Sequence, residues 1–154
     1  MNQVPKIVMT REGLSELKKE LDELMKTKRP EAVVRLAVAR GQGDLSENSE
    51  YAAAKQDLAF MDGRIAELDQ VISEAKVVAT HSKLKIDVGC KVTLHVNGKK
   101  DTYLIVGEWE ADPAARKISH SSPLGKALLG KKVGEKVEVE APIGKIIYKV
   151  LHIE

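Results

Sequence analysis

The residues best suited to chemistry lie between Gly41 and Tyr51, in the segment GQGDLSENSEY. Asp44 precedes Glu47 by three residues, which is the spacing of an N-cap acid and its capping-box partner, so we expect a helix to begin here after the glycines. If that helix continues, steps of three, four and four place four side chains on one face: Asp44, Glu47, Tyr51 and Lys55.

Two carboxylates on one exposed edge could hold part of the ligand shell of a divalent cation. Magnesium takes about six oxygen ligands, so Asp44 and Glu47 cannot bind it tightly alone, and another molecule would have to supply the rest. Acids at a turn are also commonly just solvated, and the spacing leaves that alternative open. The neighbouring Arg40 and Lys55 could either neutralise the acids or contact a phosphate.

Helical repeats on both sides must position this segment. Thr10 is a suitable N-cap, and leucines recur after it at helical spacing: Leu14, Leu17, Leu21 and Leu24. Pro30 lacks a backbone donor, so we expect a kink or short break near it, with the pattern resuming in a shifted phase to about Gln42. Lys26, Lys28, Arg29 and Arg35 form a basic stretch that could follow a nucleic-acid strand or simply be solvated.

A second apolar seam follows the acidic segment, at heptad spacing: Leu58, Met61, Ile65, Leu68 and Ile72. With few residues between the two seams, the helices must run antiparallel. The sequence therefore predicts a slender coiled-coil hairpin with Asp44 and Glu47 at its tip. Because such a hairpin exposes much surface for little core, an interaction role is favoured over a structural one.

The C-terminal half predicts a small α+β domain. A linker over 78–85 leads to a strand over 86–96, and Asn97-Gly98 predicts a hairpin to a second strand over 101–106. A short helix over 123–129, closed by Gly130, precedes strands over 133–141 and 145–153. The fold class is α+β, with an antiparallel two-helix coiled coil over 1–78 and, over 79–154, a small antiparallel sheet with one short helix.

The composition excludes several classes of function. Among 154 residues there are one Phe, one Trp and one Cys, so aromatic ligand pockets, disulfide frameworks and CxxC zinc sites are not expected. The net charge is +2, which gives no overall attraction to nucleic acid or membrane. The four histidines are scattered and no GxSxG, P-loop or GxGxxG motif is present, so we expect no self-contained active site. No apolar run could span a bilayer, and we expect a soluble, cytoplasmic protein.

Two segments together resemble the bacterial transcript cleavage factors of the GreA/GreB family. The first is ARGQGDLSENSEYAAAK at residues 39–55, and the second is ISHSSPLGKALLGKKVGEKVEV at residues 118–139. The resemblance implies an N-terminal coiled coil that enters the secondary channel of RNA polymerase and an FKBP-like C-terminal domain that docks at the channel rim.

The resemblance also implies roles for individual residues. Asp44 and Glu47 match the two tip acids, which help to hold a magnesium ion and its attacking water in the polymerase active site, so that a backtracked RNA is hydrolysed near its 3' end. Arg40, Lys55 and Tyr51 match residues that contact RNA or phosphate near the tip. The resemblance implies that Ser122 and Pro123 take part in docking to the polymerase. We expect a monomer that has no tightly bound cofactor, shares magnesium with the polymerase, contacts the nascent RNA 3' end and does not associate with membranes.

Two positions depart from the family pattern. Ser121 stands where members often have an acid just before the Ser-Pro, which bears on the strength of docking. Ser49 replaces an alanine that is common at the tip, a change we expect to be tolerated. The tip is not the multi-aspartate version of inhibitory relatives, which favours activation of cleavage.

Two other functions stay open on the sequence. One is a channel-binding regulator that inhibits polymerase without cleavage. The other is a prolyl isomerase, suggested only by the FKBP-like fold and disfavoured because this half offers only Tyr103, Trp109 and Tyr148 to line a pocket.

Overall fold

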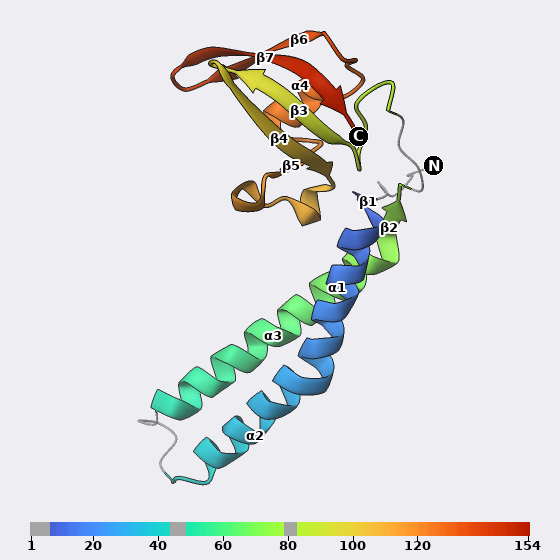
Figure 1. Ribbon diagram of the computed structural model, residues 1–154. Coiled ribbons are helices and arrows are strands. Elements are labelled where there is room, and N and C mark those ends of the chain that lie inside the picture. Colours follow the sequence, from blue (N-terminus) through green and yellow to red (C-terminus); the bar gives the residue numbers. More distant parts are fainter. Residues whose placement is uncertain (1–6, 44–48, 79–82) are drawn as a thin grey trace, which may run out of the picture. The chain divides into compact units, whose positions relative to one another are not determined.

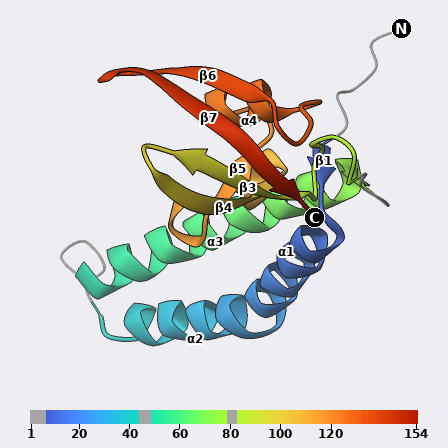
Figure 2. The same ribbon diagram turned by 45° about the horizontal axis from the view of Figure 1, so that its top comes forward.

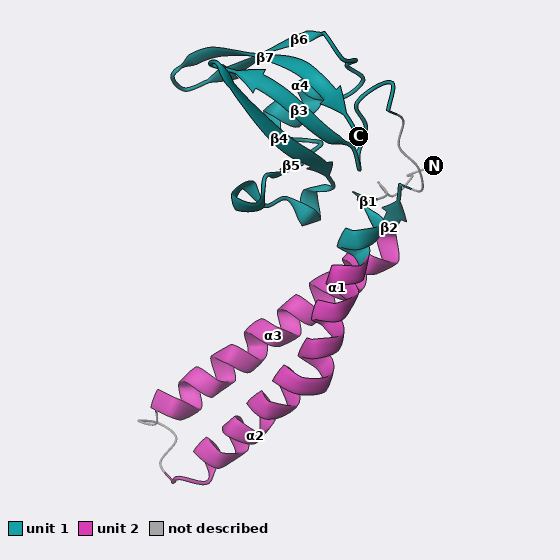
Figure 3. Ribbon diagram, in the orientation of Figure 1, with its two compact units in different colours: residues 1–14, 75–154 teal, residues 15–74 magenta. Residues whose placement is uncertain are grey.

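The computed structural model of the protein describes residues 7–43, 49–78 and 83–154 (Figure 1). By compactness the chain forms two units, one made of residues 1–14 with 75–154 and the other of residues 15–74 (Figure 3). The sequence places the domain boundary after residue 78. The compact units divide the chain after residues 14 and 74, so the residues that flank the helical hairpin on both sides group with the C-terminal unit.

Three long helical segments make up the hairpin. α1 spans Arg11–Glu23, α2 spans Arg29–Arg40 and α3 spans Ser49–Glu74. Ion pairs of Arg29 with Asp62 and of Arg35 with Asp57 show that α2 and α3 run antiparallel, as predicted. Buried apolar side chains fill the seam between the two arms: Leu17, Leu24, Ala32, Ala39, Ala54, Leu68 and Val71.

The kink predicted near Pro30 takes the form of a π-helical turn, Leu24–Lys28. The Arg29 N–H bonds to the Leu24 carbonyl, five residues earlier, instead of the usual four. Proline has no N–H to continue the α-helical ladder, and the extra residue in the turn shifts the phase of the seam. The first arm changes direction between α1 and α2, which Figure 2 shows.

Two short strands frame the base of the hairpin. β1 (Ile7–Met9) pairs in parallel with β2 (Ala75–Val77), a pair that the sequence did not predict. Met9 is fully buried and Val8 packs against the C-terminal core. The first strand of the chain is therefore part of the C-terminal unit.

The C-terminal unit is a five-stranded sheet in the order β5-β4-β3-β7-β6, with α4 (Pro123–Leu128) packed on one face. Its strands are β3 (Lys91–Val96), β4 (Lys99–Val106), β5 (Lys117–Ser119), β6 (Lys136–Ala141) and β7 (Gly144–Ile153). The core lies between the sheet and α4 and includes Leu94, Ile105, Leu128 and Val150, each fully buried.

The α+β class is confirmed, whereas several details of the sheet differ from the sequence prediction. The strand β5 was not predicted, and β6 begins at Lys136 rather than at residue 133. The sheet is antiparallel except for β4 and β5, which pair in parallel. The strand predicted from residue 86 begins only at Lys91, because residues 86–90 form a turn whose apolar side chains Ile86, Val88 and Cys90 are buried in the core. The Asn97-Gly98 hairpin is confirmed, with φ of 50° and 76° at the two turn residues.

Candidate functional site

The hairpin end holds the predicted RNA-contacting side chains, whereas Asp44 and Glu47 lie outside the described residues. Arg40 is the last residue of α2 and is exposed. On α3, Tyr51 is half-buried and Lys55 is exposed, one helical turn further along the same face. The structure therefore brings Arg40, Tyr51 and Lys55 to the same end of the hairpin.

Small side chains let the two arms approach closely near this end. Ala32 and Ala39 of α2 and Ala54 of α3 are each at most 4% exposed. Behind them, Arg29 Nε lies 2.6 Å from Asp62 Oδ1, and Asp62 raises the pKa of Arg29, mainly through this hydrogen bond. The alanine contacts and the ion pair together hold the arms in one register.

Nearer the base, Arg64 of α3 connects two helices of the hairpin. Its guanidinium donates to Glu20 of α1 at 2.8 and 3.1 Å and to Glu67 of α3 at 2.6 Å. The Arg64 hydrogen bond lowers the pKa of Glu20, and the pKa of Arg64 is raised by the same bonds. This network ties α1 to α3.

An apolar groove of about 340 Å³ lies behind the hairpin end. Its lining residues are Val34, Arg35, Val38, Ala39, Glu50, Ala53 and Ala54. Val34 and Val38 are 62% and 59% exposed. The sequence pattern correctly places these valines in a helix, but it does not show that alanines fill the seam. The larger valine side chains therefore lie outside the seam.

The loop that carries the predicted docking residues is held by its own hydroxyl groups. Ser122 Oγ donates to the Ser119 carbonyl at 2.7 Å and accepts from Gly125 N at 3.0 Å, which caps α4. Ser121 Oγ and Ser119 Oγ are 2.8 Å apart. A Cβ at position 125 would overlap the Ser119 carbonyl oxygen, so glycine is required there. Pro123 is the first residue of α4 and is exposed.

Glu110 anchors the first helix of the hairpin, a role that the sequence did not reveal. Its carboxylate accepts from Thr10 N at 2.8 Å, from the Thr10 hydroxyl and from Gly107 N at 3.0 Å. Thr10, which is 7% exposed, also caps α1 by accepting from Gly13 N at 3.1 Å. A Cβ at Gly13 would overlap the Glu110 carboxylate.

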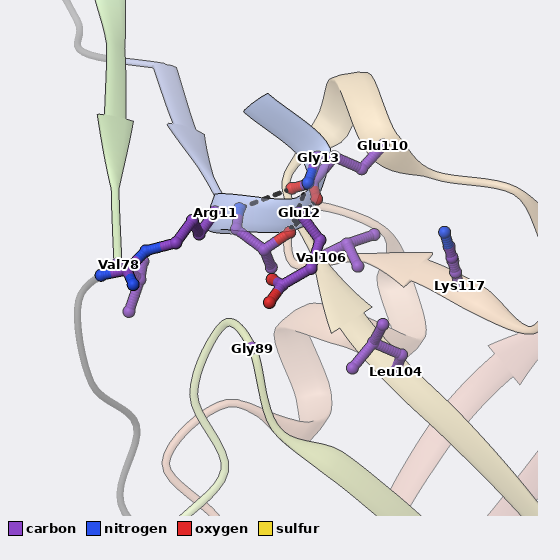
Figure 4. A pocket seen from close by; sticks show the side chains of 10 residues that line it. Arg11, Glu12, Gly13, Val78, Gly89, Leu104, Val106, Glu110 and Lys117 are labelled. Carbon is purple, nitrogen blue, oxygen red and sulfur yellow. Dashed lines mark hydrogen bonds between the residues drawn. The ribbon is translucent and has the colours of Figure 1, made fainter. Parts of the chain in front are cut away.

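A cavity of about 380 Å³ adjoins this anchor (Figure 4), and its lining is polar and aliphatic. None of Tyr103, Trp109 and Tyr148 is among its lining residues, and Tyr103 and Tyr148 instead pack against the core. The aromatic-lined pocket that a prolyl isomerase requires is therefore not formed by this cavity.

Potential metal ligands and reactive groups are dispersed. Within residues 7–43, 49–78 and 83–154, no group of three or more His, Cys, Asp or Glu side chains could hold a metal ion. Burial raises the pKa of the Cys90 thiol, which disfavours a nucleophilic role. No helix in the described part of the chain is both long and apolar enough to cross a bilayer.

Comparison with known proteins matches both parts of the chain. Residues 7–77 match the N-terminal domain model of the GreA/GreB transcription elongation factors, and residues 81–154 match the C-terminal model. The chain is 46% identical to transcription elongation factor GreA of Lactococcus lactis subsp. cremoris, over 95% of this chain and 96% of that protein. It is 47% identical to GreA of Caldanaerobacter subterraneus, over 96% of each.

Among solved structures, GreA factor homolog 1 of Thermus thermophilus is 30% identical, with 97% of this chain and 99% of that chain covered and a TM-score of 0.46. A helical hairpin joined to an α+β unit, with both family models matched in order, defines a two-domain factor rather than a self-contained enzyme. The chain belongs to the GreA/GreB family of transcription elongation factors. Both of these relatives are GreA factors.

Proposed function

We propose that the protein binds bacterial RNA polymerase, inserts its helical hairpin into the secondary channel and stimulates the polymerase to cleave backtracked RNA near its 3' end. Family membership supports an elongation role. The observation that carries the proposal is the antiparallel pair α2 and α3, whose connecting residues include Asp44 and Glu47. Basic side chains flank that connection at Arg40 and Lys55.

Asp44 and Glu47 are the residues that would take part in holding magnesium. Two carboxylates supply at most a few of the about six oxygens that magnesium takes, so the polymerase and the RNA must provide the others. An ion held there would supply an activated water molecule, and another ion in the polymerase active site would stabilise the leaving oxygen of the phosphodiester.

The other residues at the hairpin end would position the RNA. The positively charged side chains of Arg40 and Lys55 can donate hydrogen bonds to a phosphate, and the Tyr51 hydroxyl can donate another. The Ser122-Pro123 segment of the C-terminal unit would dock at the channel rim. Its internal hydrogen bonds present this segment in a defined shape, which lowers the ordering cost of binding.

The decisive experiment measures RNA shortening in stalled elongation complexes. We expect wild type to shorten the transcript, and Asp44→Asn or Glu47→Gln to lower the rate by at least about 100-fold, as loss of one preorganised charged group does elsewhere. Asp69→Asn is the matched control, because it neutralises an exposed carboxylate elsewhere on α3, and it should support cleavage like wild type.

Two outcomes would overturn the proposal. If wild type gives no shortening but slows RNA synthesis, the protein is a channel-binding inhibitor. If both tip variants cleave like wild type, the acids do not take part in the reaction.

A further inference from the structure

Four exposed side chains form a row across the outer face of the five-stranded sheet. The strand register pairs Lys100 of β4 with His95 of β3, His95 with Lys149 of β7, and Lys149 with Lys136 of β6. Directly paired residues of antiparallel strands project to the same face, about 5 Å apart. We call these four residues the basic row.

The basic row faces away from the core. Leu94, Val150 and Val137, each next to a member of the row in sequence, are at most 5% exposed and belong to the core cluster. Because side chains alternate between the two faces of a strand, the row lies on the opposite face, and all four of its members are exposed.

Glu138 of β6 lies on the same face two residues from Lys136, and it pairs with Lys145 rather than with a member of the row. That pair is 3.4 Å apart, and Arg116 pairs with Asp101 at 2.6 Å. No ion-pair partner lies within 4 Å of a row member in the part of the chain that the structure describes. Like charges directly opposite one another destabilise a sheet, so Lys136 beside Lys149 carries an energetic cost that a bound anion would relieve.

We propose that the basic row binds the phosphate backbone of single-stranded RNA, so that the C-terminal unit contributes a nucleic-acid contact separate from the hairpin end. Three steps between strands give a row about 14 Å long, which is enough for a few consecutive phosphates. The face is an open sheet without an aromatic member in the row, so binding should be independent of base sequence.

Single-stranded RNA is preferred to an acidic protein surface or duplex DNA because of the substrate in the proposed function. The substrate in the proposed function is the 3' segment of a transcript, and a flexible single strand can follow a row of basic side chains across a sheet. The choice of RNA thus rests on the proposed function, but its test needs no polymerase. A failure of RNA binding is therefore distinguishable from a failure of cleavage.

The test is a fluorescence anisotropy titration of the whole protein with a labelled oligouridine at a series of salt concentrations. Each phosphate contact contributes about 0.7 to the slope of log K against log salt for single strands, so Lys136→Gln/Lys149→Gln should lower the slope by about 1.4. Lys83→Gln/Lys126→Gln removes the same charge from exposed positions outside the row and should keep the wild-type slope. The basic residues of the hairpin are unchanged in both variants.

A charge-preserving variant guards against a folding artefact. Lys136→Arg/Lys149→Arg should keep the wild-type slope, and a loss there would overturn the proposal. Equal losses of slope in Lys136→Gln/Lys149→Gln and in the Lys83→Gln/Lys126→Gln control would also overturn it. The proposal would fail as well if duplex DNA bound as tightly as the RNA and responded in the same way to Lys136→Gln/Lys149→Gln. An unchanged RNA slope with weaker binding to nucleic-acid-free polymerase would assign the row to a protein partner instead.

Discussion

At the scale of single residues, Glu110 shows how one carboxylate can organise two distant parts of the chain. Glu110 and Thr10 are 100 residues apart, yet the carboxylate accepts both the backbone N–H and the hydroxyl of Thr10. Gly107 supplies a third donor and also lets β1 pass closely, since a Cβ there would overlap the Val8 carbonyl oxygen. The first turn of α1 is thereby fixed within the C-terminal unit.

Replacing Glu110 should therefore destabilise the protein. Glu110→Ala leaves partly buried donors on Thr10 and Gly107 without this acceptor, and we expect a loss of about 1–3 kcal/mol in the free energy of unfolding. Chemical denaturation measures it. Glu108→Ala, an exposed acid in the same 3-10 turn, is the matched control and should change stability by less than about 0.5 kcal/mol. Equal losses in the two variants would show that the anchor does not stabilise the fold.

Ser121, which the sequence marks as a departure from the family pattern, forms hydrogen bonds with Ser119. Its backbone N–H donates to Ser119 Oγ at 3.1 Å and the two hydroxyls lie 2.8 Å apart. The Ser121 side chain is neutral and lies within hydrogen-bond distance of another hydroxyl of the same loop. Docking at this position should therefore depend less on salt than it would with a carboxylate.

At the scale of elements, the hairpin is held by a few polar bridges as well as by its seam. The π-helical turn at Leu24–Lys28 separates α1 from α2, and Arg64 joins α1 to α3 on the base side of that turn. Because these helices expose most of their surface, bridges of this kind help to set the register that the narrow apolar seam leaves loosely defined.

The Arg64 bridge predicts a pH dependence. Because the pKa of Glu20 is lowered from its ordinary value of 4.5, ionised Glu20 stabilises the folded state above that value, and this contribution is lost as the pH falls below it. Glu20→Gln should cost about 0.2–1 kcal/mol at pH 7, since the pair is partly exposed, and the difference from wild type should vanish in acid.

Denaturation of wild type and Glu20→Gln between neutral and acid pH measures this difference. Glu16→Gln, an exposed site on the same helix, is the control and should show little effect at any pH. A Glu20→Gln cost that stays constant down to strongly acid pH would contradict the linkage.

At the scale of the whole molecule, the proposed function assigns polymerase binding and RNA cleavage to different parts of the chain. Pro123 is exposed at the start of α4, whereas the tip acids lie between α2 and α3 in the other unit. We expect Pro123→Ala to weaken polymerase binding by about tenfold, or about 1.4 kcal/mol, while cleavage at saturating protein stays near wild type. Asp44→Asn should do the reverse.

Polymerase affinity and saturated cleavage rate, measured on the same variants, test this division. Pro142→Ala changes another exposed proline, in the turn between β6 and β7, and should leave both quantities unchanged. If Asp44→Asn lowered affinity as much as Pro123→Ala does, docking and chemistry would not be separable.

The sequence by itself determined the features that depend on near neighbours. Asn97-Gly98 makes the predicted hairpin turn because both residues adopt positive φ, and Ser122 caps α4 three residues before the N–H that it accepts. The seam was predictable along α1 and α3 because apolar spacing reports the buried face of a helix, whereas along α2 the buried residues are alanines that the pattern did not single out. The family pattern added roles for the tip acids, which lie outside the described residues.

Only the tertiary structure decided the contacts that join distant segments. The Thr10–Glu110 anchor, the parallel pairing of β1 with β2 and the alignment of Lys149 between His95 and Lys136 each depend on strand register or chain path. These partners are separated by tens of residues, and local spacing carries no information about which of many possible registers buries the most apolar surface. Packing of the whole core makes that choice.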